Sequence, residues 1–413
     1  MPLHLFDAFG VELEYMVVDA ATLDVRPIVD RLFEQVTGQI VSDIERGDID
    51  WSNELVRHVV EFKTAQPVAA LAGLSSSFQR QVATVNAELQ SLGARLMPTA
   101  MHPWMDPQRE MRLWPHDNSP IYETFHRVFD CRGHGWANLQ SVHLNLPFSG
   151  AESPDDEFGR LHGAVRLLLP ILPGIAASSP IMDRRLTGRQ DNRLEVYRTN
   201  SRRVASVAGR VIPERAFTQR DYEHMIFEPM FAEIAPFDPD GHLQDEFLNA
   251  RGAIARFGRG SIEIRVLDIQ ECPTADLAVV SAIVNVLQAL VGERWSSLAE
   301  QQAVEIEPLY AILNRTIHDA EQAIIDDADY LRLLGWTSPQ RCTAGELWRF
   351  LIAETGGTDA VPPELSAALQ VILERGPVAR RITERLRDDS SRETLQAIYQ
   401  NLCTCLAEGR MFE

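Results

Sequence analysis

Two glutamates one residue apart, Glu12 and Glu14, interrupt the apolar segment G-V-E-L-E-Y at residues 10–15. Successive side chains of a strand point to opposite faces, so the two carboxylates share one face and their apolar neighbours share the other. Like charges on one strand repel and are costly to desolvate. A divalent cation would resolve that conflict, because carboxylate oxygens are hard ligands suited to Mg²⁺ or Mn²⁺. A solvated strand face with ordinary alternation explains the same pattern without a metal.

Three further strand-like segments place polar, metal-competent residues between apolar ones. These residues are Glu61 in segment 58–64, with Glu54 shortly before it, Ser141, His143 and Asn145 in segment 140–148, and Ser261, Glu263 and Arg265 in segment 261–269. If the four strands lie in one sheet, its polar face combines five glutamates, a histidine and an arginine. Such a face is suited to binding cations around a polyanion, with the arginine contacting a transferred phosphoryl group.

Each residue taken alone has an ordinary structural explanation. His143 fits a hydrogen-bonded histidine within a strand. Glu263 and Arg265 fit an ion pair on a solvated face, which contributes little to stability. Glu54 fits a residue on an exposed helix. The combination on four strands favours a metal and phosphate site.

Other nucleotide and hydrolase motifs are absent from the sequence. No G-x-G-x-x-G opens a helix after a strand, and no G-x-x-x-x-G-K-[ST] occurs, so Rossmann and P-loop nucleotide sites are unsupported. The chain also has no G-x-S-x-G elbow and no H-E-x-x-H helix. Gly-Arg-Gly at 258–260 fits the turn before the last of the four strands.

Composition narrows the classes of partner. With 413 residues, 45% of them hydrophobic, the chain can bury a large core. Its formal charge of −20 opposes nonspecific binding to nucleic acid or to an anionic membrane. An anionic substrate such as ATP would therefore need local cations. We expect small-molecule substrates, no nucleic acid and no membrane as partners, and the sequence leaves a homo-oligomer open.

Cysteine usage and apolar runs indicate the compartment. The five cysteines are scattered and odd in number, which favours free thiols in a reducing cytoplasm. No secretory signal pattern is visible, and the apolar segment 167–177 is interrupted by prolines and too short to span a bilayer. We expect a cytoplasmic protein.

Hydrophobic periodicity predicts an α+β fold around a largely antiparallel, curved sheet covered by helices. Residues 106–136 should form either an active-site loop or short helices, and 183–203 an irregular, arginine-rich stretch. The pattern predicts a core at 1–295 and a helical region at 296–413 packed on it, not an independent domain. Strands are expected at 9–18, 58–64, 140–148 and 261–269, and helices or helical patterns at 29–36, 74–96, 158–177, 276–290, 302–334, 345–355, 363–375 and 391–408.

An ordered set of motifs makes the chain similar to the glutamate–cysteine ligase family, most closely to its bacterial second group of carboxylate–amine ligases. The motifs span about residues 6–290 and are G-V-E-L-E-Y at 10–15, V-E-F-K-T at 60–64, M-H-P-W at 101–104, S-V-H-L-N-L-P-F at 141–148, S-S-P at 178–180 and I-E-I-R-V-L-D-I-Q at 262–270. The resemblance implies a glutamine-synthetase-like catalytic sheet that binds ATP and Mg²⁺, with Mn²⁺ as an alternative ion.

The resemblance also implies roles for individual residues. It implies metal binding by Glu12, Glu14, Glu54, Glu61, His143 and Glu263. Arg265 and Glu263 would be catalytic, Asn145 and Arg265 would contact the nucleotide or phosphate, and Arg198 would bind a substrate carboxylate. The first motif reads E-L-E where E-E-E is common, the strand at 141–148 reads H-L-N, and segment 183–203 departs from the family pattern.

The implied reaction is phosphorylation of the γ-carboxylate of glutamate, followed by attack of an amine on the acyl phosphate. Cysteine is the default acceptor, which would give γ-glutamylcysteine for glutathione biosynthesis. A second hypothesis keeps the fold but joins glutamate or another carboxylate to a different amino acid, amine or peptide. A third, from another class, is a catalytically idle nucleotide-binding or regulatory relative. Within the cation site, we expect Glu12 and Glu14 to reach different Mg²⁺ ions.

Overall fold

An open, fully antiparallel sheet forms the centre of the computed structural model, which describes residues 2–337, 341–387 and 389–413. The strand order is β2-β3-β4-β1-β6-β10-β9, and β5 pairs with the far end of β1. The bounds are β1 Gly10–Asp19, β2 Asp43–Ile44, β3 Ile49–Asn53, β4 Val59–Thr64, β5 Ala94–Met97, β6 Ser141–Pro147, β9 Ala253–Arg256 and β10 Ser261–Asp268. The expected antiparallel α+β fold is confirmed.

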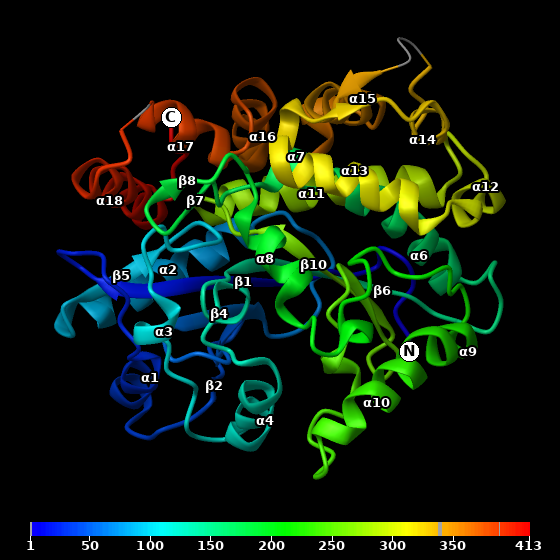
Figure 1. Ribbon diagram of the computed structural model, residues 1–413. Coiled ribbons are helices and arrows are strands. Elements are labelled where there is room, and N and C mark those ends of the chain that lie inside the picture. Colours follow the sequence, from blue (N-terminus) through cyan, green and yellow to red (C-terminus); the bar gives the residue numbers. More distant parts are fainter. Residues whose placement is uncertain (1, 338–340, 388) are drawn as a thin grey trace.

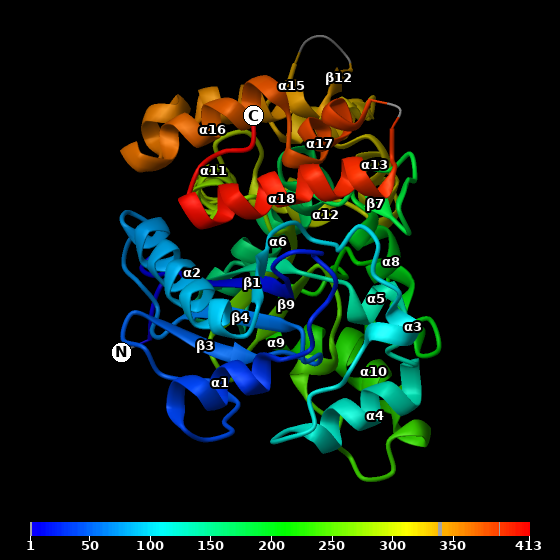
Figure 2. The same ribbon diagram turned by 90° about the vertical axis from the view of Figure 1, so that its left-hand side faces the viewer.

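Helices cover the apolar face of this sheet and extend away from it (Figure 1). Turned by 90°, the molecule shows α15 to α18 as a layer on one side of the sheet and α1, α4 and α10 on the other (Figure 2). The helices of six or more residues are α1 Val29–Thr37, α2 Leu74–Ser91, α4 Ser119–Phe129, α6 Glu157–Leu168, α8 Asn192–Asn200, α10 Glu228–Ile234, α11 Pro273–Val291, α12 Leu298–Ala303, α13 Ile306–Asp319, α14 Ala328–Leu333, α15 Ala344–Glu354, α16 Pro363–Arg375, α17 Val378–Leu386 and α18 Arg392–Glu408.

The alternation in β1 sorts its side chains as the sequence predicts. Val11, Leu13 and Tyr15 are fully buried on the helix-covered face. Behind them, α11 packs against α2, α6, α15 and α16. This helix is long and apolar enough to cross a membrane by length and composition, and 72% of its most apolar window is buried inside the molecule. It is the buried helix that the apolar run at 276–290 predicts.

Some predicted elements differ from the structure. The prediction of irregular backbone at 183–203 is wrong for its second half, which forms α8. The helix predicted at 74–96 ends at Ser91, and Gly93, with φ of 66°, turns the chain into β5. Region 302–334 is divided among α12, α13, α14 and the short strand β11 (Ile324–Ile325). The short strands β2, β3, β5 and β9 were missed because their stability comes from pairing with longer neighbours.

The segment 106–136 contains short helices, the second of the two alternatives. They are α3 Pro107–Glu110, α4, and α5 His134–Ala137. The broken apolar helix at 158–177 forms α6, a 3₁₀ turn at Leu169–Ile171 and α7 Pro173–Ala176. The helical region after residue 296 packs on the core, with α16 on α11 and α18 on α2 and β5. Its division from a core at 1–295 stays a prediction.

Three buried neutral histidines predict sensitivity to acid. Burial lowers the pKa of His58 to about 4 and the pKa of His102 and His162 to about 3. In the unfolded chain a histidine pKa is about 6.5, so the unfolded state binds more protons below that value. Their contribution to stability is present above pH 6.5 and is lost as the pH falls toward 3, by up to about 1.4 kcal/mol per pH unit for each histidine.

His162→Phe isolates one of these contributions, because the ring stacks on Phe158 at 5.3 Å and the substitution keeps an aromatic ring there. We expect the free energy of unfolding in urea to fall less steeply between pH 6 and 4 than in the wild type, by up to about 1.4 kcal/mol per pH unit. Equal slopes for the two proteins would contradict the prediction.

Candidate active site

The polar face of the sheet lines a cavity of about 390 Å³. Five glutamates and five basic side chains contribute to its wall, together with His143 and several apolar residues. The formal charges of the acidic and basic residues therefore balance locally, although the chain carries −20 overall. The basic residues are Lys63, Arg193, Arg256, Arg259 and Arg265.

Strand register determines which charges become neighbours. On β1, Glu12 lies opposite Lys63 of β4 on one side and His143 of β6 on the other. Glu14 lies opposite Glu61 of β4. Directly paired residues have side chains about 5 Å apart, so antiparallel pairing gathers carboxylates that are distant in the sequence.

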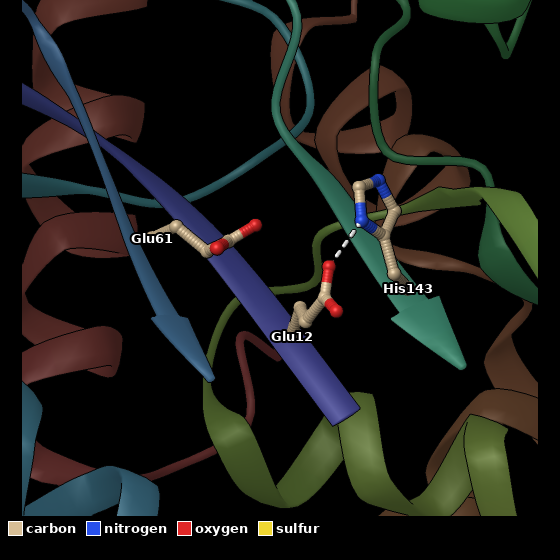
Figure 3. A group of neighbouring side chains, drawn as sticks. All are labelled: Glu12, Glu61 and His143. Carbon is tan, nitrogen blue, oxygen red and sulfur yellow. Dashed lines mark hydrogen bonds and ion pairs between the residues drawn. The ribbon is translucent and has the colours of Figure 1, made fainter. Parts of the chain in front are cut away.

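Two overlapping groups of ligand atoms result. Glu12, Glu61 and His143 form one group, and Glu14, Glu54 and Glu61 form the other, with the atoms of each group within 4.8 Å of one another. Figure 3 shows Glu12, Glu61 and His143 projecting toward one another from three adjacent strands. Glu61 belongs to both groups, whereas Glu12 and Glu14 fall in different ones. That division matches the expectation from the sequence; metal binding itself stays a prediction.

Hydrogen bonds orient two of these carboxylates. His143 Nδ1 lies 2.7 Å from Glu12 Oε2, and Asn145 Nδ2 donates to Glu12 Oε1 at 3.1 Å. Although burial opposes ionisation, the hydrogen bond and charge of His143 lower the pKa of Glu12. Glu14 Oε2 accepts from Ser141 N at 2.7 Å and from Ser141 Oγ at 2.9 Å.

The other two carboxylates are held as acids. Burial, reinforced by the charge of Glu14, raises the pKa of Glu54 to about 8. Burial and the charges of Glu12 and Glu54 raise the pKa of Glu61 well above its usual value. Oxygen atoms of Glu61 accept from Ser52 Oγ at 2.7 Å and lie 3.9 Å from Lys63 Nζ. Because burial makes the charged forms of these two carboxylates unfavourable, a hard cation bound beside them would stabilise those forms.

Glu263 has a different environment from the one expected of a metal ligand. It belongs to neither group, and its carboxylate pairs with Arg265, whose Nε lies 3.0 Å away, and with Arg256 Nε at 3.8 Å. Burial opposes ionisation, but Arg265, His143 and Arg256 lower the pKa of Glu263 to about 2. In this structure Glu263 pairs with Arg265, and its role as a metal ligand stays a prediction.

Arg198 is not brought to the cavity. Its guanidinium pairs with Glu195 at 2.5 Å and donates to Tyr310 Oη at 3.3 Å and to Asn314 of α13. Arg193, five residues earlier on α8, lines the cavity instead. Arg198 therefore lies on a different face of α8 from residues 193, 197 and 200, whose helical spacing could have indicated the face that lines the cavity. Its binding of a substrate carboxylate stays a prediction.

Sequence reasoning also missed Lys63, Arg256 and Arg259. Lys63 lies two residues after Glu61 on β4, so the period-two alternation of a strand could have placed it on the polar face. Arg256 and Arg259 belong to the β9–β10 hairpin. The sequence predicted no strand at β9, so it did not place these two arginines near the site.

A family model identifies the family of the chain, and a solved structure has a similar fold. The sequence model of glutamate–cysteine ligase family 2 matches residues 8–400. An uncharacterized protein of Archaeoglobus fulgidus is 27% identical over 406 residues, covering 98% of this chain and 99% of its own. The glutamate–cysteine ligase of Francisella tularensis, solved in complex with AMP, covers 100% of this chain and 91% of its own with a TM-score of 0.56 and 12% identity. The ligase PafA, solved with the ubiquitin-like protein Pup, gives a TM-score of 0.47 at 12% identity, covering 95% of this chain and 71% of its own.

The raised pKa values predict that cation binding releases protons. At pH 7 Glu54, with a pKa of about 8, is mostly protonated and must ionise to bind Mg²⁺. Calorimetric titration of Mg²⁺ in two buffers with different ionisation enthalpies should therefore report net proton release, and affinity should rise as the pH approaches 8. Glu54→Gln should release fewer protons. Binding with no proton release in the wild type would contradict this account.

Proposed function

The chain belongs to glutamate–cysteine ligase family 2, which places it among the amide-bond-forming ligases, and we propose that it joins glutamate to an amine in an ATP- and Mg²⁺-dependent reaction. The γ-carboxylate oxygen of glutamate attacks the γ-phosphorus of ATP, giving an acyl phosphate and ADP. The amine nitrogen then attacks the acyl carbon, a C–N bond forms, and the C–O bond to phosphate breaks. The products are the amide, ADP, phosphate and a proton. Cysteine is the first acceptor to test.

One observation carries this proposal. The two sets of metal-competent side chains, which share Glu61, lie in the same cavity as the ion pair of Arg265 and Glu263. A carboxyl and a triphosphate are both anionic, so bringing them together requires positive charge at the point of transfer. Arg193, Arg256, Arg259 and Lys63 supply further positive charge around the same space. This answers the need for local cations in a chain of charge −20.

The donor set fits Mg²⁺, because Glu12, Glu14, Glu54 and Glu61 offer hard oxygen ligands within two compact groups. When bound, the ions would offset charge on the phosphate oxygens. The residues of the protein would supply the rest of the catalysis. Arg265, held by Glu263, would stabilise the transferred phosphoryl group, and alignment of the two substrates would supply most of the rest. The chemistry requires no covalent nucleophile from the protein.

The nucleotide products test the reaction type. The full-length protein is incubated with ATP, Mg²⁺, glutamate and a panel of amines, and nucleotides, phosphate and product mass are measured. We expect ADP and phosphate in a 1:1 ratio with the amide. Detection of AMP and pyrophosphate would instead indicate an acyl adenylate as the intermediate and would contradict the acyl phosphate. No amine-dependent nucleotide cleavage with any donor would favour the idle relative.

Two substitutions test the site. Arg265→Gln removes a charge that acts on the transition state, so kcat should fall by about 10²- to 10³-fold with an unchanged fold.

Glu61→Gln removes a ligand from both sets of metal-competent side chains, and the Mg²⁺ concentration for half-maximal activity should rise at least about 10-fold. Glu293→Gln is the matched control, because Glu293 pairs with Arg160 on the surface. Full activity of both site variants would contradict the assignment.

Glu263→Gln separates the two roles considered for that residue. As the partner of Arg265 it should lower kcat while leaving the Mg²⁺ requirement near that of the wild type. If the Mg²⁺ requirement rises as strongly as in Glu61→Gln, Glu263 is a metal ligand as the family resemblance implies. Circular dichroism verifies that each variant is folded.

A further inference from the structure

Resting on the function proposed above, we infer that the α8 side of the cavity binds the acceptor as an α-amino acid with an apolar side chain. Three polar residues of α8, Arg193, Tyr197 and Asn200, line the cavity at i, i+4 and i+7 and thus lie on one face of the helix. Aromatic and aliphatic side chains line the adjoining wall. The following contacts carry this assignment.

Buried polar atoms on this face of α8 lack hydrogen-bond partners among the described residues. They are Nε of Arg193, the hydroxyl of Tyr197 and Oδ1 of Asn200, whereas Nη1 of Arg193 forms an ion pair with Asp268 but no hydrogen bond. Buried polar atoms are nearly always satisfied, and an unsatisfied one costs about 1–3 kcal/mol. The side chain of Arg193 is only 3% exposed, so bulk water does not satisfy it. A polar ligand in the cavity would.

Arg193 and Tyr197 lie at the reactive end of the site. Arg193 Nη2 donates to the backbone oxygen of Arg265 at 2.8 Å, and its Nη1 lies 3.6 Å from Asp268 Oδ1. The hydroxyl of Tyr197 lies beside the Arg265 guanidinium. Arg193 Nε and the Tyr197 hydroxyl remain as donors, which suits them to an anionic group such as a carboxylate.

Asn200 provides an acceptor with a fixed orientation. Its Nδ2 donates to the backbone oxygen of Gly135 at 2.7 Å, which leaves Oδ1 available. The contact is close enough that a Cβ on Gly135 would lie 2.7 Å from Asn200 Cβ. A neutral amide oxygen can accept from an amine without stabilising the ammonium form as a carboxylate would. The amine therefore keeps its nucleophilic form more readily.

The apolar wall is rigid and aromatic. Trp136 Nε1 donates to the backbone oxygen of Asn200 at 3.1 Å, and the indole stacks on Phe129 with centroids 5.3 Å apart. Phe125 contacts both Trp136 and Phe247, which line the cavity. All five cysteines are buried elsewhere, so none of them contributes to the cavity wall.

Together these groups match the parts of an amino acid. Donors on α8 fit its carboxylate, Asn200 Oδ1 fits its amine, and the Trp136–Phe247 wall fits an apolar side chain. Loss of one methylene group from a hydrophobic pocket costs about 10- to 200-fold in kcat/KM. Leucine or phenylalanine should therefore exceed alanine and serine as acceptors by at least about 10-fold, with cysteine between the two pairs.

Phe247→Ala tests the wall, and Phe231→Ala is the matched control because it stacks on Phe227 and does not line the cavity. We expect Phe247→Ala to raise KM for leucine at least about 10-fold, while KM for alanine, ATP and glutamate changes less than 3-fold. Asn200→Leu should raise KM for every amino acid acceptor. A wild type without preference for apolar acceptors, or Phe247→Ala and Phe231→Ala behaving alike, would overturn the inference.

A second measurement keeps this inference separate from the proposed reaction. Leucine, alanine and glutamate are titrated calorimetrically into the protein with ADP and Mg²⁺ present. Tighter binding of leucine, weakened by Phe247→Ala, supports the subsite even if no acceptor yields an amide. Ligase activity without that selectivity overturns the subsite and leaves the proposed function standing.

Discussion

Placing four carboxylates on the buried polar face of one sheet is the constraint on which the rest of this structure depends. Glu12, Glu14, Glu54 and Glu61 repel one another, and burial makes their charged forms costly. Antiparallel register forces the arrangement, because β1 lies between β4 and β6. The fold tolerates it by protonating some carboxylates, bonding others to His143 and Ser141, and leaving a cavity where a cation fits.

Basic side chains complete the electrostatics of the cavity, and apart from Lys63 of β4 they come from outside the segments that carry these four carboxylates. Arg265 is tied to Glu263 within β10, whereas Arg193 comes from α8 and binds the Arg265 backbone oxygen. The register of β10 against β6 shifts between Ile264 and Leu267, around Arg265, which leaves that oxygen free for Arg193. A local irregularity in the sheet thus connects Arg265 to the helix that lines one side of the cavity.

The helical layer stabilises this arrangement through motifs that contain no catalytic groups. His102 of M-H-P-W lies with Nε2 2.8 Å from the backbone oxygen of Leu23, and Trp104 lies beneath the guanidinium of Arg392 at 3.6 Å. Arg392 begins α18, so this motif fastens the C-terminal helix to the loop that follows β1. A short motif within the family pattern therefore serves long-range packing.

The sequence by itself determined the four long strands, the polar face of each and the family, because strand alternation and motif order are local properties of the chain. It identified the carboxylates that the structure gathers. Only the tertiary structure decided that Glu263 pairs with arginines, that Arg193 and not Arg198 faces the cavity, and that Phe247 lies beside Trp136. Those outcomes depend on helix rotation, strand register and short strands stabilised by their neighbours, which local periodicity does not encode.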